Sequence, residues 1–149
     1  MTTITLETSI KNTIEAVFNR SLDIDFHKKS TSKTKETAIA GVTSGIIGPH
    51  ETVTWRGKHF GVFLTHTSLI SSFEKPYTFT DEMIEGNFKS FKHVHTFSNS
   101  NGVTTAKDVL KYETPFGIFG KLFDFLFLKR HLTKFLSIRN LAIKNSLEG

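Results

Sequence analysis

Alternation of apolar and polar residues opens the chain. Along residues 2–10, one side of an extended backbone would carry Ile4, Leu6, Thr8 and Ile10, and the other side would carry polar side chains. A period of two is typical of a strand with one face against a core. We therefore predict that the chain begins with a half-buried β-strand.

Two short helical segments are predicted after this strand. Asn12 or Thr13 can cap the first, because their side-chain oxygens accept hydrogen bonds from backbone N–H groups of a first turn. Its apolar residues recur at helical spacing at Ile14, Val17 and Phe18. A second short turn is predicted at residues 23–29, with Ile24 and Phe26 as its apolar anchors.

Strand-like stretches separated by turn residues fill the chain from residue 36 to 112. The turn signals are 45–48 with Pro49, Arg56-Gly57, Lys75-Pro76, Glu85-Gly86 and 99–102. Asn101-Gly102 is the strongest of them, because both residue types accept the positive φ of a tight hairpin, here joining 88–97 to 103–112. No helical stretch interrupts the block, so we predict an antiparallel sheet.

The period becomes helical after Pro115. The predicted apolar stripe consists of Leu122, Phe125, Leu126, Leu132, Phe135, Leu136, Ile143 and Leu147. Its polar edge is predicted to consist of Lys129, Arg130, Lys134, Arg139 and Lys144. We expect this long helix to lie across the concave face of the sheet. The predicted fold is α+β: a curved antiparallel sheet of about seven strands, two short helices and a long C-terminal helix, all in one domain spanning residues 1–149.

Composition favours a globular chain with an aromatic interior. Hydrophobic residues make up 38% of the sequence and include 15 Phe, against 22% charged residues, whereas disorder requires low hydrophobicity and high charge. There is no cysteine, so disulfides and thiolate metal clusters are excluded.

Neither a membrane span nor a secretion signal is expected. The most apolar stretch, residues 116–128, is interrupted by Lys121 and Asp124 and is shorter than the roughly 20 residues that cross a bilayer. The N-terminal segment has no basic region followed by a continuous apolar run. We therefore expect a cytoplasmic protein.

The positive charge of the chain does not indicate nucleic-acid binding. The net charge is +5, but Lys28, Lys29, Lys33 and Lys35 gather in a Ser/Thr-rich segment typical of a solvated loop. Binding grooves for nucleic acids interleave basic and aromatic side chains on one face. No such pattern is found, so a nucleic-acid partner is not expected.

Several short runs resemble a known superfamily across nearly the whole chain. They are Gly41-Val-Thr-Ser-Gly45, Val53-Thr-Trp55, His59-Phe-Gly61, Pro76-Tyr-Thr-Phe-Thr-Asp81, Gly86-Asn-Phe88, His93-Val-His95-Thr-Phe97, Asp108, the run 112–120 (YETPFGIFG) and Arg139-Asn140. With the order of elements, they look like a bacterial branch of the START/polyketide-cyclase/allergen-like superfamily, called SRPBCC. The resemblance implies a helix-grip fold with an internal cavity for lipids, sterols, polyketides or aromatic compounds. A minority of relatives are cyclases or dehydratases, and no cofactor is implied.

The predicted ligand-binding residues are those that strand parity and the helical stripe place towards such a cavity. They are Trp55, Phe60, His66, Phe91, His95, Tyr112, Phe119 and Phe123. An aromatic set fills a core as readily as it lines a cavity, so packing is the alternative.

A catalytic role is the second hypothesis for the cavity. His66, His93 or His95 could act as a base oriented by Asp108 or Tyr112, because a carboxylate can orient an imidazole that exchanges protons near neutral pH. No nucleophile stands in a recognisable context. His93 and His95 share a strand face, but no acidic or sulfur ligand lies at a fitting spacing, so no metal is predicted.

The segment from Pro115 to Leu128 is predicted to form a gate over the cavity. Gly117 and Gly120 give the backbone freedom at the change from strand to helix, and apolar residues occupy more than one helical face. Phe119 could instead be a core residue. A third hypothesis is a membrane-surface or protein-interaction module built on Phe116, Phe119, Phe123 and Phe127. Monomer and homodimer are both compatible with the sequence.

Overall fold

The structure is a computed structural model that describes residues 1–148. Across these residues seven strands form one sheet: β1 (Thr2–Ile10), β2 (Thr37–Gly41), β3 (Thr52–His59), β4 (Val62–Glu74), β5 (Thr78–Glu85), β6 (Ser90–Ser100) and β7 (Val103–Glu113). The helical elements are α1 (Ile14–Ser21), α2 (Ile24–Ser30), the 3-10 turn η1 (Ser32–Thr34), α3 (Gly117–Phe123), the π-helical turn η2 (Asp124–Leu128) and α4 (Lys129–Glu148). The predicted α+β class is confirmed.

The sheet is an antiparallel meander with one exception. Its strand order is β1-β7-β6-β5-β4-β3-β2, so β2 to β7 follow one another as neighbours. The exception is β1, which pairs with β7 at the edge of the sheet opposite β2. The β6–β7 hairpin turns at Asn101 and Gly102, whose φ angles are 54° and 81°, as predicted. The turn expected at Arg56-Gly57 was wrong, because β3 continues through both residues and turns at Phe60 and Gly61 instead.

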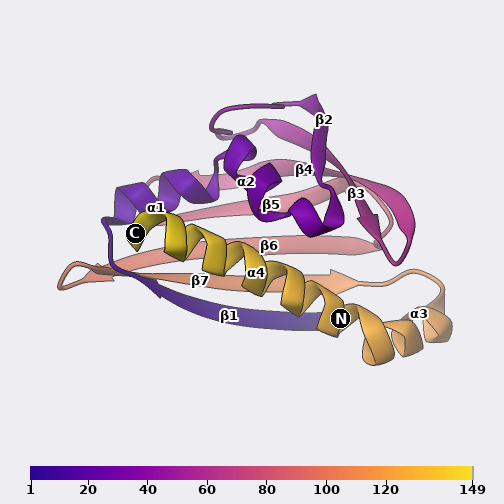
Figure 1. Cartoon of the computed structure of the whole chain (residues 1–149). Helices are drawn as coiled ribbons and strands as arrows, with labels where there is room; N and C mark the ends of the chain where they lie inside the picture. Colours follow the sequence, from indigo (N-terminus) through magenta and orange to yellow (C-terminus); the bar gives the residue numbers. More distant parts are fainter. Residues whose placement is uncertain (149) are drawn as a thin grey trace.

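The long helix lies across the concave face of the sheet. Figure 1 shows α4, in yellow, running over β7, β6 and β1, with α1 beside its C-terminal end, α2 beside its middle and α3 projecting beyond the sheet at the other end. This is the helix-grip arrangement that the sequence predicted. The helical caps follow from local chemistry, since Thr13 and Asp23 each accept a backbone hydrogen bond at the start of α1 and α2.

Two apolar clusters hold the sheet and helices together. The first centres on Phe18 of α1, which is fully buried and meets Phe73, Phe79 and Phe97 edge-on at ring separations of 5.4–5.6 Å. The second joins β1 and β7 to η2 and the first turns of α4 through Ile4, Leu110, Tyr112, Leu128, Leu132 and Leu136. The interior left between the sheet and α4 forms the cavity described below.

The predicted helical stripe is correct over α4 and wrong before it. Leu132, Leu136 and Ile143 are buried, but Leu122, Phe125 and Leu126 are exposed by 55%, 85% and 46%. The reason is that α3 and η2 lie past the edge of the sheet, so no second layer covers them. Arg139, predicted on the polar edge, is buried and 8% exposed, because its guanidinium reaches inward to the sheet.

Across residues 1–148, the structure contains no helix that combines the length and the apolar character needed to cross a membrane.

Candidate functional site: a cavity between sheet and helix

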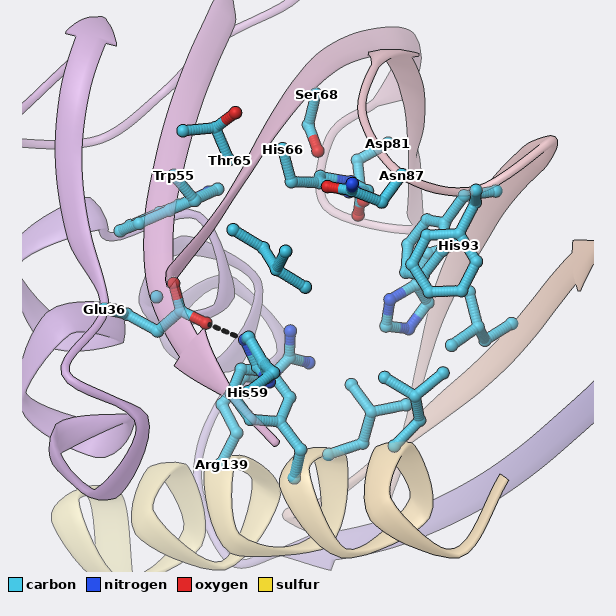
Figure 2. Close-up of a pocket in the computed structure, with 18 of the residues that line it drawn as sticks. Glu36, Trp55, His59, Thr65, His66, Ser68, Asp81, Asn87, His93 and Arg139 are labelled. Carbon is cyan, nitrogen blue, oxygen red and sulfur yellow. Dashed lines mark hydrogen bonds and ion pairs between the residues drawn. The ribbon is translucent and has the colours of Figure 1, made fainter. Parts of the chain in front are cut away.

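A cavity of about 670 Å³ separates the concave face of the sheet from α4. Most of its wall is apolar, and polar side chains are interspersed around it. Figure 2 shows Glu36, His59 and Trp55 on one side and His93 on the other, while Arg139 rises from the helix below. Along the top, between the two sides, lie Thr65, His66, Ser68, Asp81 and Asn87. The cavity therefore combines a large apolar wall with interspersed polar groups, which is the usual construction of a small-molecule site.

Seven of the eight residues predicted to bind ligand line this cavity. They are Trp55, Phe60, His66, Phe91, His95, Phe119 and Phe123. Trp55 lies against His27, with ring centroids 4.3 Å apart, and Phe91 lies against His66 at 4.8 Å. Contact with a ligand stays a prediction for each of them.

Tyr112 does not line the cavity. Its side chain is fully buried in the cluster between β7 and α4, where its hydroxyl donates a 2.5 Å hydrogen bond to Asp124. Thr2 donates a second hydrogen bond to the same carboxylate. Burial, together with the neighbouring Asp124 carboxylate, raises the pKa of Tyr112. The tyrosine therefore fastens η2 to the sheet.

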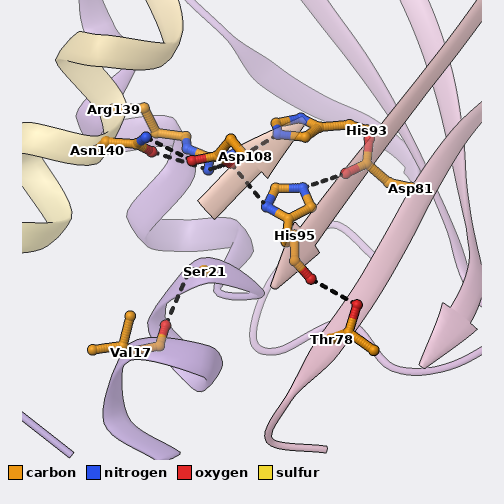
Figure 3. Close-up of polar contacts among 9 residues, drawn as sticks. All are labelled: Val17, Ser21, Thr78, Asp81, His93, His95, Asp108, Arg139 and Asn140. Atoms are coloured by element: carbon orange, nitrogen blue, oxygen red, sulfur yellow. Dashed lines mark hydrogen bonds and ion pairs between the residues drawn. The ribbon is translucent and has the colours of Figure 1, made fainter. Parts of the chain in front are cut away.

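Asp108 is the centre of a buried polar cluster beside the cavity. Its Oδ1 accepts hydrogen bonds from His93 Nε2 at 2.8 Å and Arg139 Nη2 at 3.3 Å, and its Oδ2 accepts one from Asn140 Nδ2 at 2.7 Å. Figure 3 shows these groups converging from β6, β7 and α4. Burial alone would raise the pKa of Asp108, but the hydrogen bonds from the two histidines and the charge of Arg139 hold it well below its usual range.

His95 bridges two carboxylates, and this environment favours its protonated form. Its Nε2 lies 2.8 Å from Asp81, and its Nδ1 lies 3.2 Å from Asp108. Burial opposes the charge, but the hydrogen bonds to Asp108 and Asp81 outweigh it and raise the pKa of His95. Only the protonated ring has an N–H group to offer to each of the two carboxylates.

His93 and His27 are neutral neighbours of this cation. Burial and the adjacent His95 charge lower the pKa of His93, whose ring stacks on His95 at 3.7 Å. Burial and the charge of Arg139 lower the pKa of His27 to about 3. Since His93 Nε2 donates to Asp108, its Nδ1 is a hydrogen-bond acceptor.

Charges balance within the cluster. Burial would raise the pKa of Asp81, but the hydrogen bond from His95 and the surrounding positive charges lower it to about 2. Asp81 and Asp108 are therefore anions that face the cations His95 and Arg139. Asp81, His93 and His95 could also hold a metal ion, since one ligand atom from each lies within 4.8 Å of the others. Here Asp81 pairs with His95, and His93 pairs with Asp108, and we propose no metal.

A second polar group lies on the opposite wall of the cavity. His59 bonds through Nδ1 to His131 at 2.8 Å and through Nε2 to Glu36 at 3.0 Å. Burial and the neighbouring His59 lower the pKa of His131. Gly57 makes this arrangement possible, because a Cβ on it would lie 2.5 Å from the Glu36 carboxylate.

The sequence prediction missed several polar residues of the cavity, among them His27, Glu36, Asp81 and Arg139, and it missed Asn140 in the cluster beside the cavity. One signal was available for the last two. Positions 139 and 140 continue the inward row of Leu132, Leu136 and Ile143 at helical spacing. A polar pair on such a row indicates a buried hydrogen-bonding partner.

The catalytic candidates are partly brought together. His93 and His95 converge on Asp108, and all three are buried. His66 lies apart against Phe88 and Phe91 on the aromatic wall, where burial lowers its pKa. Tyr112 is bonded to Asp124 instead. An Asp-His pair beside a cavity is therefore present, without the predicted tyrosine.

No protein-family model and no curated protein sequence matches the chain. Solved structures do. A protein of Thermus thermophilus has a TM-score of 0.76 at 17% identity, over 97% of this chain and 99% of its own. Ginseng major latex-like protein 151 from Panax ginseng has a TM-score of 0.71 at 14% identity, over 99% of this chain and 98% of its own. A START superfamily protein from Mycobacterium smegmatis has a TM-score of 0.73 at 11% identity, over 98% of this chain and 97% of its own.

These likenesses confirm, at the level of the fold, the resemblance found in the sequence. The chain has the helix-grip fold of the START and major latex-like proteins, matched over nearly its whole length. At identities this low the likeness concerns the backbone fold alone. The function has to be argued from the residues of the cavity.

Proposed function

We propose that this protein binds a mostly apolar small molecule in the cavity between its sheet and α4. The cavity of about 670 Å³ carries the proposal, because pockets of roughly 300–1,000 Å³ are those that enclose drug-sized ligands. The START-like fold supports it. We also propose that the chain acts as one domain in the cytoplasm.

The aromatic wall favours a ligand with rings or a long apolar chain. Trp55, Phe88, Phe91 and Phe135 line the cavity, and their flat faces offer large contact areas at little entropic cost. Lipids, sterols, polyketides and aromatic compounds all share this chemistry.

The buried cluster gives the ligand a polar anchor. Arg139 lines the cavity, and its hydrogen bonds to Asp108 and Asn140 both come from Nη2. The other terminal N–H groups of the guanidinium are donors from which a ligand oxygen could accept a hydrogen bond. Because the cluster charges already balance, a neutral acceptor such as a carbonyl or hydroxyl oxygen fits better than a second anion.

Ligand binding can be tested by filling the cavity. Ser68 is buried and lines it, so Ser68→Phe should reduce the free volume. Thermal shifts with a panel of fatty acids, sterols, polyketides and flavonoids, and native mass spectrometry of protein from its own host, should detect ligands that Ser68→Phe abolishes. Ser72→Phe is the control, because Ser72 lies exposed on the same strand. A panel and extracts without any ligand would contradict the proposal.

The anchor can be tested separately with Arg139→Lys. Lysine keeps a cation near Asp108 but lacks the forked terminal N–H groups of the guanidinium. A panel member bearing a carbonyl should bind about tenfold more weakly, the value of one lost hydrogen bond of about 1.4 kcal/mol. Its analogue without the oxygen should bind equally well to both proteins. An equal loss of affinity for both ligands would show that the ligand carbonyl does not bind at Arg139.

Catalysis of the cyclase, dehydratase or hydrolase kind is the second candidate. It is favoured by His93, a neutral imidazole oriented by Asp108 at 2.8 Å in the cavity wall. Conversion of any bound panel compound should then be detectable by mass spectrometry. His93→Gln should stop conversion while binding persists. Recovery of every bound compound unchanged would contradict catalysis and support binding alone.

A further inference from the structure

An exposed apolar surface surrounds the mouth of the cavity. Its members are exposed apolar residues of α3 and η2 and the residue before α3: Phe116, Ile118, Phe119, Leu122, Phe125 and Phe127. Phe116, Ile118 and Phe119 are 82%, 77% and 77% exposed. Phe116 and Phe119 also line the cavity. We call this set the mouth surface. Apolar patches of this kind on a folded chain mark sites of interaction.

The fold holds the mouth surface outward. Within the segment, the buried row consists of Gly120, Asp124 and Leu128, at every fourth residue. The absence of a side chain at Gly120 lets α3 pack closely against Pro115, since a Cβ there would lie 1.8 Å from the Pro115 carbonyl oxygen. Asp124 is fixed by Tyr112 and Thr2. The phenylalanines are therefore presented to the surroundings by an anchored element.

The tip of the β3–β4 hairpin enlarges this surface. Phe60, Val62 and Phe63 are 50%, 56% and 43% exposed. Phe60 contacts Phe123 of α3 with ring centroids 5.1 Å apart, and both line the cavity. Two segments far apart in sequence thus form one apolar rim around the mouth.

Positive charges border the rim. Lys121, Lys129, Arg130 and Lys134 are exposed along the helical segment, and between residues 115 and 135 the sequence has one acidic residue, the buried Asp124. On the hairpin, the Arg56 guanidinium lies 4.0 Å from the centre of the Phe63 ring and the Lys58 ammonium 5.9 Å from it. Apolar side chains bordered by cations are complementary to an anionic lipid surface.

We propose that the mouth surface and the hairpin tip dock onto an anionic membrane surface, with the cavity mouth facing the lipid. The phenylalanines enter the boundary between headgroups and acyl chains, and the surrounding lysines and arginines contact the headgroups. A rigid protein partner on the same rim would seal the cavity, whereas a fluid bilayer covers the apolar rim and leaves a path for an apolar molecule. The docking requires no particular cavity ligand.

Vesicle sedimentation tests the apolar part of the proposal. The protein should pellet with vesicles of equimolar phosphatidylcholine and phosphatidylglycerol. The double variant Phe119→Ser, Phe125→Ser should partition about tenfold or more less strongly, because two large apolar side chains no longer enter the boundary. Leu141→Ser is the matched control, since Leu141 is 55% exposed on α4 away from the rim. Binding by the control should equal that of the unchanged protein.

Charge reversal tests the electrostatic part. Lys129→Glu with Arg130→Glu should weaken binding to the anionic vesicles by about thirtyfold or more, because each charge near the surface contributes about 1 kcal/mol. The same variant should bind phosphatidylcholine vesicles as the unchanged protein does. Lys111→Glu, on an exposed strand position, should have little effect. Added salt should weaken binding of the unchanged protein.

Three results would overturn the proposal: no binding to anionic vesicles, equal binding by the Phe119/Phe125 double variant, or a dimer in light scattering that the double variant converts to monomer. The last would assign the rim to self-association. Thermal melting of each variant confirms that it folds. Vesicle binding is measured without a cavity ligand, so its failure is separate from a failure of ligand binding.

Discussion

Asn140 on α4 donates a 2.7 Å hydrogen bond to the Asp108 carboxylate on β7. The bond joins the long helix to the sheet at a point from which water is excluded. Arg139, the preceding residue, donates to the same carboxylate. One aspartate therefore fixes α4 over the cavity and sets the charge of the histidines beside it.

Replacement of Asp108 by Asn should destabilise the protein severely. The change preserves the shape of the side chain but removes the negative charge that His95 and Arg139 face. Breaking a buried charge pair by loss of one partner typically costs about 3–5 kcal/mol. Denaturant unfolding measures this free energy. Asp25→Asn is the control, since Asp25 forms a surface pair with Lys28 that is worth at most about 1 kcal/mol. Similar losses for both variants would contradict the central role of Asp108.

Tyr112→Phe should loosen the segment that carries the mouth surface. The variant keeps the ring but leaves the buried Asp124 without its tyrosine donor, at a cost of about 1–3 kcal/mol. Hydrogen exchange of amides 123–128 should become faster. Tyr77→Phe is the matched control, because Tyr77 is 58% exposed and should change neither quantity. Unaltered exchange in Tyr112→Phe would show that apolar packing alone holds η2.

Stability should fall as the pH drops from 7 to 5, in part because of His27. The pKa of His27 is lowered from 6.5 to about 3 in the folded protein. The unfolded chain therefore takes up a proton below pH 6.5 that the folded chain does not. The stabilisation is complete above pH 6.5 and is lost towards pH 3, by about 2 kcal/mol at pH 5. Denaturant unfolding at both pH values measures it.

The His27→Gln variant isolates this contribution. Its stability should fall by about 2 kcal/mol less than that of the unchanged protein between pH 7 and 5. A decline remains because His66 and His93 also have lowered pKa values. His95 acts in the opposite direction, since its raised pKa gives stabilisation that is complete below pH 6.5 and is lost on passing above its folded value. An identical fall in both proteins would mean that His27 is charged when folded.

Phe119→Ala should change ligand uptake more than stability. At 77% exposure in the wall of the cavity mouth, Phe119 has little packing to lose, so the free energy of unfolding should change by about 0.5 kcal/mol or less. The association rate of a bound panel compound should change, as expected of a gate. Phe18→Ala is the contrast, since Phe18 is fully buried and truncation should cost about 3–5 kcal/mol. A large stability loss with unchanged uptake in Phe119→Ala would reject the gate.

Local pattern in the sequence predicted the elements and their assembly well. Alternation identified β1, and the requirement for positive φ identified the turn at Asn101 and Gly102. Gly57 shows the limit of such signals. Its residue type indicated a turn, but the glycine is required because the Glu36 carboxylate occupies the space of its Cβ, and Glu36 lies far from it in sequence.

The polar cluster and the rim were decided by tertiary structure. Strand parity placed His93 and His95 on one face, but the β6–β7 register set His95 opposite Asp108, and the crossing of α4 brought Asn140 to the same carboxylate. Helical period likewise predicted burial for Phe125, which is 85% exposed. Periodicity specifies which side of an element is apolar. What covers that side depends on where the sheet ends, and here it ends before α3.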